Sequence, residues 1–249
     1  MSFKTIWFAL ACLVSLPLAA QSPEVITMDQ EPHHHLVLHN EYVKVFNVVV
    51  SPGDSIVLHR HDQDTVAIAI GEQLVTVGLP GKPDVHQKNA DAQVRLQRSG
   101  YMHSTHVDGD TPYHTVAVEL MRPQTNFHNV CAEILPGQPL NCQEGFAKVS
   151  PSSSTLELIE SGETRVRFVR VHPHQLVNLA NSAGGRGASQ VIVALDAASI
   201  SAGTSREAER AMQPGDFAWI DGASGPGHVY QNRGDKEARF VEIIFTSPR

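Results

Sequence analysis

The stretch that decides the fold is PGDSIVLHRH, residues 52–61. Its first two residues predict a type II turn, because proline fixes φ and the glycine supplies the positive φ that this turn requires. The residues after the turn have the pattern of a β-strand, in which side chains two positions apart point to the same face. His59 and His61 are therefore expected to project together, at the spacing of two ligands of one metal ion.

A second stretch, GYMHSTHVDGDTP at residues 100–112, carries the next candidate ligand. His103 would come from a separate strand and complete a face of three imidazoles, which suits zinc, copper, iron, nickel or manganese. The alternative is that His59 and His61 are surface residues of an edge strand and His103 is a hydrogen-bonded loop residue. The turn signals on both sides of the histidines favour the metal site.

Most of the chain has the period-two hydrophobic pattern of β-strands, interrupted by turns rich in glycine and proline. The expected strands of the first half are residues 42–50, 55–58, 65–70, 74–79, 94–97 and 114–121. No amphipathic helix longer than about two turns is expected, although residues 206–212 have the pattern of a single short helical turn. Many short strands at regular spacing predict an all-β chain of antiparallel sandwiches or barrels.

The second half of the chain resembles the first. The segment EYVKVF at Glu41 matches ETRVRF at Glu163, an offset of 122 residues, and the segment at Gly109 matches the one at Gly234, an offset of 125. A repeat of this size predicts a duplicated domain. We expect an N-terminal barrel over residues 21–121, a linker rich in Pro, Asn, Gln and Ser over 122–155, and a C-terminal barrel over 156–249.

The first 20 residues have the layout of a secretory signal peptide: Lys4, an apolar stretch at 6–16 and a cleavage site after Ala20. A membrane anchor is the alternative, but the stretch is short for a span of about 20 residues. We therefore expect export to the periplasm or the medium, with no membrane span after cleavage. In an exported protein Cys131 and Cys142 are expected to form a disulfide, with a pair of free or metal-binding thiols as the alternative.

The composition excludes several classes of protein. With 41% hydrophobic and 18% charged residues among 249, the chain is too apolar for disorder and not apolar enough for a polytopic membrane protein. The formal net charge is −7 and no basic run occurs, so a nucleic-acid partner is not expected. The sequence also lacks a Gly-x-Ser-x-Gly elbow, a phosphate-binding loop and a dinucleotide fingerprint, which excludes the enzyme classes that depend on them.

The two histidine stretches together resemble the motifs of the cupin superfamily. The first motif of that family reads Gly, five residues, His-x-His, three or four residues, Glu, six residues, Gly, and here Gly53, the His-x-His pair and Gly71 match it. In the second motif a histidine stands six residues before a Gly-Asp-x-Pro turn, as His103 does here and as His228 stands before Gly234. The resemblance covers residues 30–121 well and 156–247 weakly. It implies jelly-roll barrels with a metal in the barrel mouth, duplicated into a bicupin.

This chain departs from the cupin pattern at the metal-binding glutamate. Counting forward from His61 reaches Thr65, whereas counting back from Gly71 reaches Asp64. Asp64 is therefore the only carboxylate in position to act as a fourth metal ligand. Without it, the site would consist of three histidines, with water completing the coordination shell.

The second half departs further, because Asn181 and Ala183 stand opposite His59 and His61. The second barrel is therefore expected to be degenerate: metal-free and structural, or a site for an organic ligand. Outside the motifs, the residues 33–35 are three adjacent histidines. Adjacent residues on a strand cannot all face one way, so this tract is interpreted as a solvated N-terminal segment.

The resemblance implies one divalent transition metal, Fe, Mn or Zn, and a small-molecule ligand or substrate. The leading hypothesis is a metal-dependent oxygenase or related oxidoreductase, with Tyr101 and His106 as candidates for proton transfer or the pocket wall. The alternatives are a binding module without turnover and a purely structural barrel without a metal. The duplication would let one chain act as its own dimer, and a homo-oligomer stays open.

Overall fold

The computed structural model describes residues 25–129, 140–142, 155–178, 188–202, 209–222 and 228–246. These residues form β-strands and one short 3-10 helix, η1 (Met28–Gln30), which confirms the all-β prediction. No helix within those ranges is long and apolar enough to cross a membrane. The expected signal peptide at residues 1–20 and the expected disulfide partner Cys131 lie outside the described residues.

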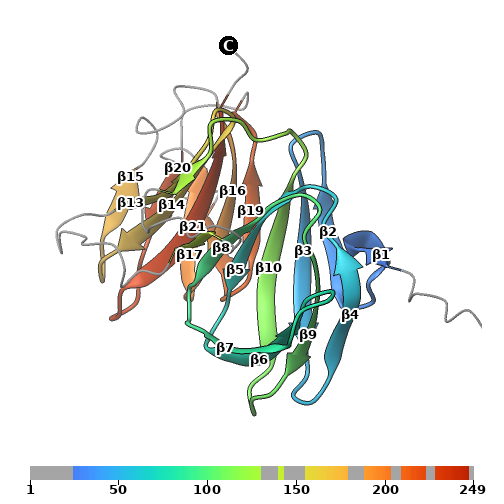
Figure 1. Ribbon diagram of the computed structural model, residues 1–249. Coiled ribbons are helices and arrows are strands. Elements are labelled where there is room, and N and C mark those ends of the chain that lie inside the picture. Colours follow the sequence, from blue (N-terminus) through green and yellow to red (C-terminus); the bar gives the residue numbers. More distant parts are fainter. Residues whose placement is uncertain are drawn as a thin grey trace, which may run out of the picture.

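The first half of the chain folds into two facing sheets, shown in blue to green in Figure 1. Its strands are β1 (Ile26–Thr27), β2 (His34–His39), β3 (Val43–Val50), β4 (Ser55–Arg60), β5 (Asp64–Ala69), β6 (Gln73–Gly78), β7 (Val85–Asn89), β8 (Val94–Gln97), β9 (Met102–Val107) and β10 (Tyr113–Leu120). One sheet has the order β1-β4-β9-β6-β7. The other has the order β8-β5-β10-β3-β2, extended next to β8 by β12 (Leu140–Cys142). All pairs are antiparallel except β1 with β4.

The second half repeats this arrangement. Its strands are β11 (His128–Asn129), β13 (Thr155–Glu160), β14 (Thr164–Val171), β15 (Leu176–Asn178), β16 (Ser189–Ala194), β17 (Ala198–Ala202), β18 (Glu209–Met212), β19 (Phe217–Ile220), β20 (His228–Gln231) and β21 (Ala238–Phe245). They form a sheet of order β11-β13-β14-β21-β16-β19 and a sheet of order β15-β20-β17-β18. The chain is thus built from two jelly-roll barrels.

The two barrels have matching registers at their central strands. In the first, β3 and β10 are eight residues each and place Phe46 opposite Ala117. In the second, β14 and β21 are also eight residues each, and the same position places Arg167 opposite Glu242. These two side chains are 2% and 0% exposed and form a buried ion pair. The second barrel thus carries a paired charge at a position where the first is apolar.

The two six-stranded sheets pack face to face and share one hydrophobic core. The shared core takes fully buried side chains from both halves, among them Val45, Val66, Val118, Phe168, Val193 and Val241. The opposite faces of the same strands fill the interior of each barrel, with Phe46 and Ile56 in the first and Phe240 and Tyr230 in the second. Strands such as β10 are therefore buried on both faces, and the halves lie side by side in Figure 1.

Two local expectations change. The short helical turn expected at residues 206–212 is wrong for its described part, because residues 209–212 form β18, which pairs with β17. The segment expected as a linker contributes strands to both halves. β11 pairs with β13 in the second half, whereas β12 pairs with β8 in the first.

Candidate metal centre

The histidine cluster is built by the β4–β9 pair. These strands are antiparallel, and His59 lies directly opposite His103. His61 follows just after β4, where its backbone N–H donates to the carbonyl of Tyr101 at 2.9 Å. The turn before β4 has Gly53 at φ +81°, as the sequence predicts. The strand alternation then brings His59, His61 and His103 to the interior of the barrel.

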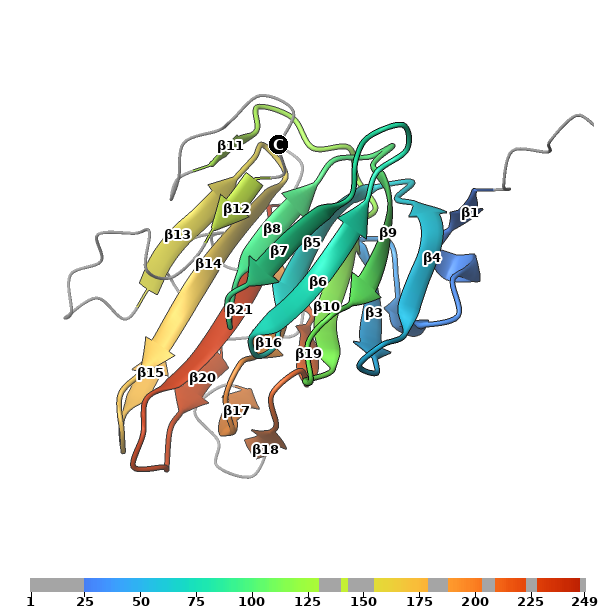
Figure 2. The same ribbon diagram turned by 60° about the horizontal axis from the view of Figure 1, so that its bottom comes forward.

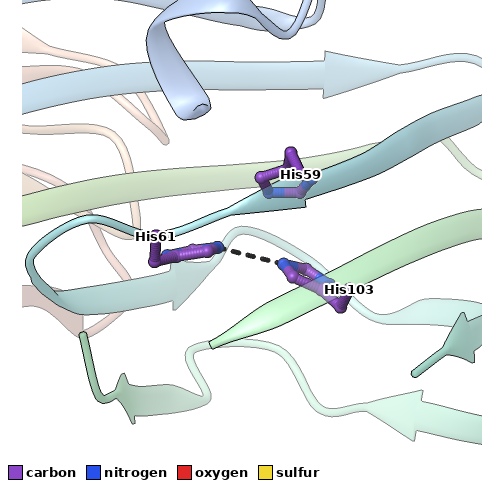
Figure 3. A group of neighbouring side chains, drawn as sticks. All are labelled: His59, His61 and His103. Atoms are coloured by element: carbon purple, nitrogen blue, oxygen red, sulfur yellow. Dashed lines mark hydrogen bonds between the residues drawn. The ribbon is translucent and has the colours of Figure 1, made fainter. Parts of the chain in front are cut away.

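The three imidazoles lie close together, and the dashed line in Figure 3 marks the hydrogen bond between His61 and His103. One ring nitrogen from each lies within 4.8 Å of the other two, and the Nε2 atoms of His61 and His103 are 3.0 Å apart. Two nitrogens bound at right angles to a metal about 2.1 Å away lie about 3.0 Å from each other. The spacing of His61 and His103 is that of the hydrogen bond between them, and it also fits two ligands of one ion bound at right angles.

The far side of each ring contacts a neighbour, which for Nδ1 of His103 is Oγ1 of Thr105 at 3.3 Å. Nδ1 of His59 donates to the carbonyl of Val57 at 2.9 Å. Nδ1 of His61 donates to Oγ1 of Thr65 at 3.1 Å, and Thr65 in turn donates to the Gln63 carbonyl. Because a neutral imidazole carries one proton, these contacts direct the Nε2 lone pairs of His59 and His61 into the cluster, where that of His61 faces Nε2 of His103.

Burial keeps the cluster uncharged. The side chains of His59, His61 and His103 are 0%, 2% and 6% exposed. Burial, with a smaller contribution from His34, lowers the pKa of His59 to about 4. Burial also lowers the pKa values of His61 and His103 well below the ordinary value, and the neighbouring histidines add to the effect. Neutral imidazoles are the form that binds a metal.

One nitrogen of the cluster lacks any protein partner. Nε2 of His59 is buried and has no hydrogen-bond partner within the described part of the chain. A buried polar atom without a partner is costly, and native structures rarely keep one without a reason. A metal ion bound to this lone pair would supply the missing interaction, so the residues present fit a transition metal.

The structure adds a residue that the sequence analysis missed. His34, at the start of β2, is buried with its ring centroid 4.7 Å from that of His59, so the interpretation of residues 33–35 as a solvated tract is wrong for it. Its Nδ1 donates to Oε2 of Glu31 at 2.7 Å. Burial raises the pKa of the Glu31 carboxyl, but hydrogen bonds from His34 and His33 outweigh this and bring the pKa to about 2.

Asp64 is not brought to the cluster. On β5, Thr65 faces His61 and the barrel interior, whereas Asp64 shares the opposite face with Val66 of the core between the barrels. Oδ1 of Asp64 accepts from the backbone N–H of Ser99 at 2.8 Å and pairs with Arg98 at 3.2 Å. The strand alternation therefore turns this carboxylate away from the three histidines.

His106 is also turned away. It lies three residues after His103 on β9, and an odd separation on a strand places two side chains on opposite faces. His106 is exposed and its Nδ1 contacts Oγ of Ser55 at 2.8 Å. In the second half, Asn181 and Ala183 fall outside the described residues. Within the described ranges the cluster of His59, His61 and His103 is the one group of metal-binding side chains found.

A cavity of about 260 Å³ lies beside the cluster and is lined by residues of β5 and β10 and of β6 and β7. Figure 2 shows how these four strands are arranged. His103 and Tyr101 line it, and their ring centroids are 4.9 Å apart. Burial raises the pKa of the Tyr101 phenol, so its hydroxyl keeps its proton at neutral pH. The structure thus brings Tyr101, but not His106, to the space next to the cluster.

The comparisons with known proteins bear on the fold. No protein-family model and no curated protein sequence matches the chain. Among solved structures, salicylate 1,2-dioxygenase from Pseudoaminobacter salicylatoxidans in complex with gentisate aligns with a TM-score of 0.57 at 12% identity. The alignment covers 85% of this chain and 74% of that one. The chain has a cupin fold.

Two further solved structures also align with the chain over most of its length. Oxalate decarboxylase from Bacillus subtilis, a protein with Mn(II) centres, aligns with a TM-score of 0.53 at 15% identity, covering 84% of this chain and 70% of that one. AerE from Microcystis aeruginosa aligns with a TM-score of 0.51 at 9% identity, covering 87% and 99%. At such identities the likeness concerns the cupin fold alone.

Proposed function

We propose that this cupin is a metal-dependent enzyme that acts on a small molecule, of the oxygenase or related oxidoreductase type. His59, His61 and His103 would hold one divalent transition metal. The observation that carries the proposal is the buried Nε2 of His59, which has no protein partner while its Nδ1 is engaged by the Val57 carbonyl. Iron, manganese and zinc all accept neutral imidazoles.

A metal held in this way would supply Lewis-acid or redox chemistry at its open coordination positions. The chain's own residues supply the rest. Tyr101 lines the adjoining cavity and keeps the proton on its Oη, so it can donate a hydrogen bond or a proton to an oxygen of a bound molecule. Tyr101 and His103 lie side by side in that space, with ring centroids 4.9 Å apart, so a molecule bound there would contact both.

Two of the structural neighbours are enzymes, and the proposed reaction type is taken from them by analogy. One is a salicylate 1,2-dioxygenase solved with gentisate, and another is an oxalate decarboxylase with Mn(II) centres. We propose that the second barrel of this chain is the degenerate one and has a structural role. Its interior position equivalent to Phe46 and Ala117 is filled by the Arg167–Glu242 ion pair.

A second candidate is a cupin that binds a metal or small ligand without turnover. The observation that favours it is the absence of a carboxylate from the described histidine cluster, because Asp64 faces the other side of β5. Carboxylate ligands often serve in acid–base steps, and this cluster would have to rely on Tyr101 for them.

The test uses the full chain, loaded with Fe(II) or Mn(II) without oxygen and then mixed with air and candidate substrates. Salicylate, gentisate, oxalate, thiols, phenols and flavonoids are screened by oxygen uptake and product analysis. We expect turnover of at least one of them, lost in His103→Ala and reduced roughly a hundredfold or more in Tyr101→Phe. His35→Ala, which changes an exposed histidine of β2, is the matched control. Bound metal with every candidate unaltered would favour the non-catalytic protein.

We also propose export through the sequence at residues 1–20. Mass spectrometry of the protein recovered from cells is expected to find a mature chain that begins at Gln21. A chain that retains residues 1–20 in full would contradict the proposal.

A further inference from the structure

The cavity beside the histidines contains a cation without a counter-ion. Arg95 lies on β8, and its Nη2 donates to the side-chain oxygens of Asn89 and, at 3.3 Å, of Gln93. The Gln87 amide lies 2.6 Å from Nη1 of Arg95 and accepts from it once its oxygen faces the guanidinium. All three partners are neutral amides. Among the described residues that line the cavity, none is an aspartate or a glutamate.

No carboxylate among the described lining residues compensates the positive charge of Arg95. A guanidinium stays protonated in a protein, and Arg95 is partly buried. A charge partly removed from water carries a cost that an opposite charge would offset. Burial lowers the pKa of Arg95, which reflects that cost. A second cation, Lys82, also lines the cavity from the loop before β7. With two cations and no carboxylate among the described lining residues, the cavity is positive overall and is complementary to an anion.

The other residues that line the cavity and its volume indicate the polarity and size of the rest of the ligand. Ala67 and Ala69 of β5 and Val75 and Val77 of β6 give the cavity an apolar side. Its volume of about 260 Å³ lies just below the range of about 300–1,000 Å³ usual for ligand pockets, so only a small molecule fits. A guanidinium matches a planar carboxylate with two parallel hydrogen bonds.

We propose that this cavity binds a small organic carboxylic acid, with its carboxylate on Arg95 and its apolar body against β5 and β6. The inference rests on the proposed function in one respect: it identifies the bound acid as the substrate presented to His103 and Tyr101. Arg95 is then the residue that selects the substrate class and fixes the orientation of the substrate.

The test measures binding of four probes to the full chain by calorimetry, before and after removal of metal with a chelator. Benzoate and propionate are compared with benzamide and propionamide, which have the same shapes without the charge. In the metal-free protein at least one acid is expected to bind more than tenfold tighter than its amide. Arg95→Gln is expected to abolish this preference, whereas Arg95→Lys retains part of it.

The matched control is Lys88→Gln, which removes the same charge from an exposed side chain of β7 that pairs with Glu72. It is expected to keep the preference for acids. The proposal is overturned if neither acid binds tighter than its amide, if folded Arg95→Gln keeps the preference, or if inorganic phosphate binds as tightly as the better acid. Elemental analysis separates the two claims. If the protein prefers acids but never binds metal, the proposed function alone is refuted. If it binds metal but shows no preference for acids, the carboxylate-binding role of Arg95 alone is refuted.

Discussion

Lowering the pH from 7.5 to 5.5 should leave the metal affinity of the histidine cluster nearly unchanged. A metal binds the unprotonated imidazole, so protons compete with it only below the pKa of each ligand. Burial lowers the pKa of His59 to about 4 and those of His61 and His103 well below the ordinary value. At pH 5.5 the three ligands are therefore still neutral.

The size of the effect follows from these values. An ordinary histidine with a pKa of about 6.5 is roughly nine-tenths protonated at pH 5.5, which weakens metal binding about elevenfold. Three such ligands together would lose a factor of roughly a thousand. At a pKa of about 4, His59 is only about 3% protonated at pH 5.5, so competition from protons is negligible.

The assay is isothermal calorimetry of Mn(II) and Zn(II) with the metal-free full chain at both pH values, with circular dichroism to verify the fold. We expect dissociation constants that agree within about threefold, which is less than about 1 kcal/mol. His35→Ala should behave as the wild type, since this side chain is exposed. A loss of about a thousandfold between the two pH values would refute the argument that burial keeps the ligands neutral.

Three further predictions concern stability and the support of the site. Glu119 is 3% exposed, and burial raises its pKa to about 7. Because the folded pKa lies above the unfolded one, this group stabilises the fold below pH 4.5, and that contribution is lost as the pH rises through 7. Glu119→Gln should therefore gain up to about 3 kcal/mol relative to the wild type between pH 4.5 and 8.5 in urea unfolding, whereas a constant difference would contradict the shift. Phe168→Ala, in the core shared by the barrels, should cost about 3–5 kcal/mol with both halves unfolding in one transition, and two separate transitions would argue against a shared core. Thr65→Val removes the acceptor for Nδ1 of His61 and should weaken metal binding about 10–100-fold by calorimetry; an unchanged affinity would exclude a positioning role for Thr65.

The cupin fold and the histidine trio could be predicted because both depend on local patterns. The turn at residue 53 needs a positive φ, and a glycine at that position indicates such a turn. His59 and His61 are two residues apart on an extended segment. The Gly-Asp-x-Pro turn that begins six residues after His103 identified the second motif and, with it, this histidine as a ligand. In each case a short stretch of sequence is enough to determine the geometry.

The misplaced residues depend on strand parity, which a short motif does not determine. The two ways of counting toward Asp64 disagreed by one residue, and one residue decides which face of a strand a side chain takes. The pairing of β5 with β10 settles this parity and turns Asp64 away. For His106, its odd separation from His103 already carried the signal, because both lie on β9.

Two other features depend on tertiary packing. Alternation shows that the middle residue of the 33–35 tract faces opposite to its neighbours, but only the packing of the N-terminal segment brings His34 to His59. Arg95 is likewise one basic residue in an ordinary strand pattern. Its significance comes from the neutral amides around it and from the cavity that it lines.

Elemental analysis shows directly whether His59, His61 and His103 hold a transition metal. The full chain is purified without a histidine tag, beside a His59→Ala/His61→Ala variant of the same preparation. We expect about one equivalent of iron, manganese or zinc in the wild type and none in the variant. If neither protein contains metal, even after incubation with all three ions, these histidines are not a metal site.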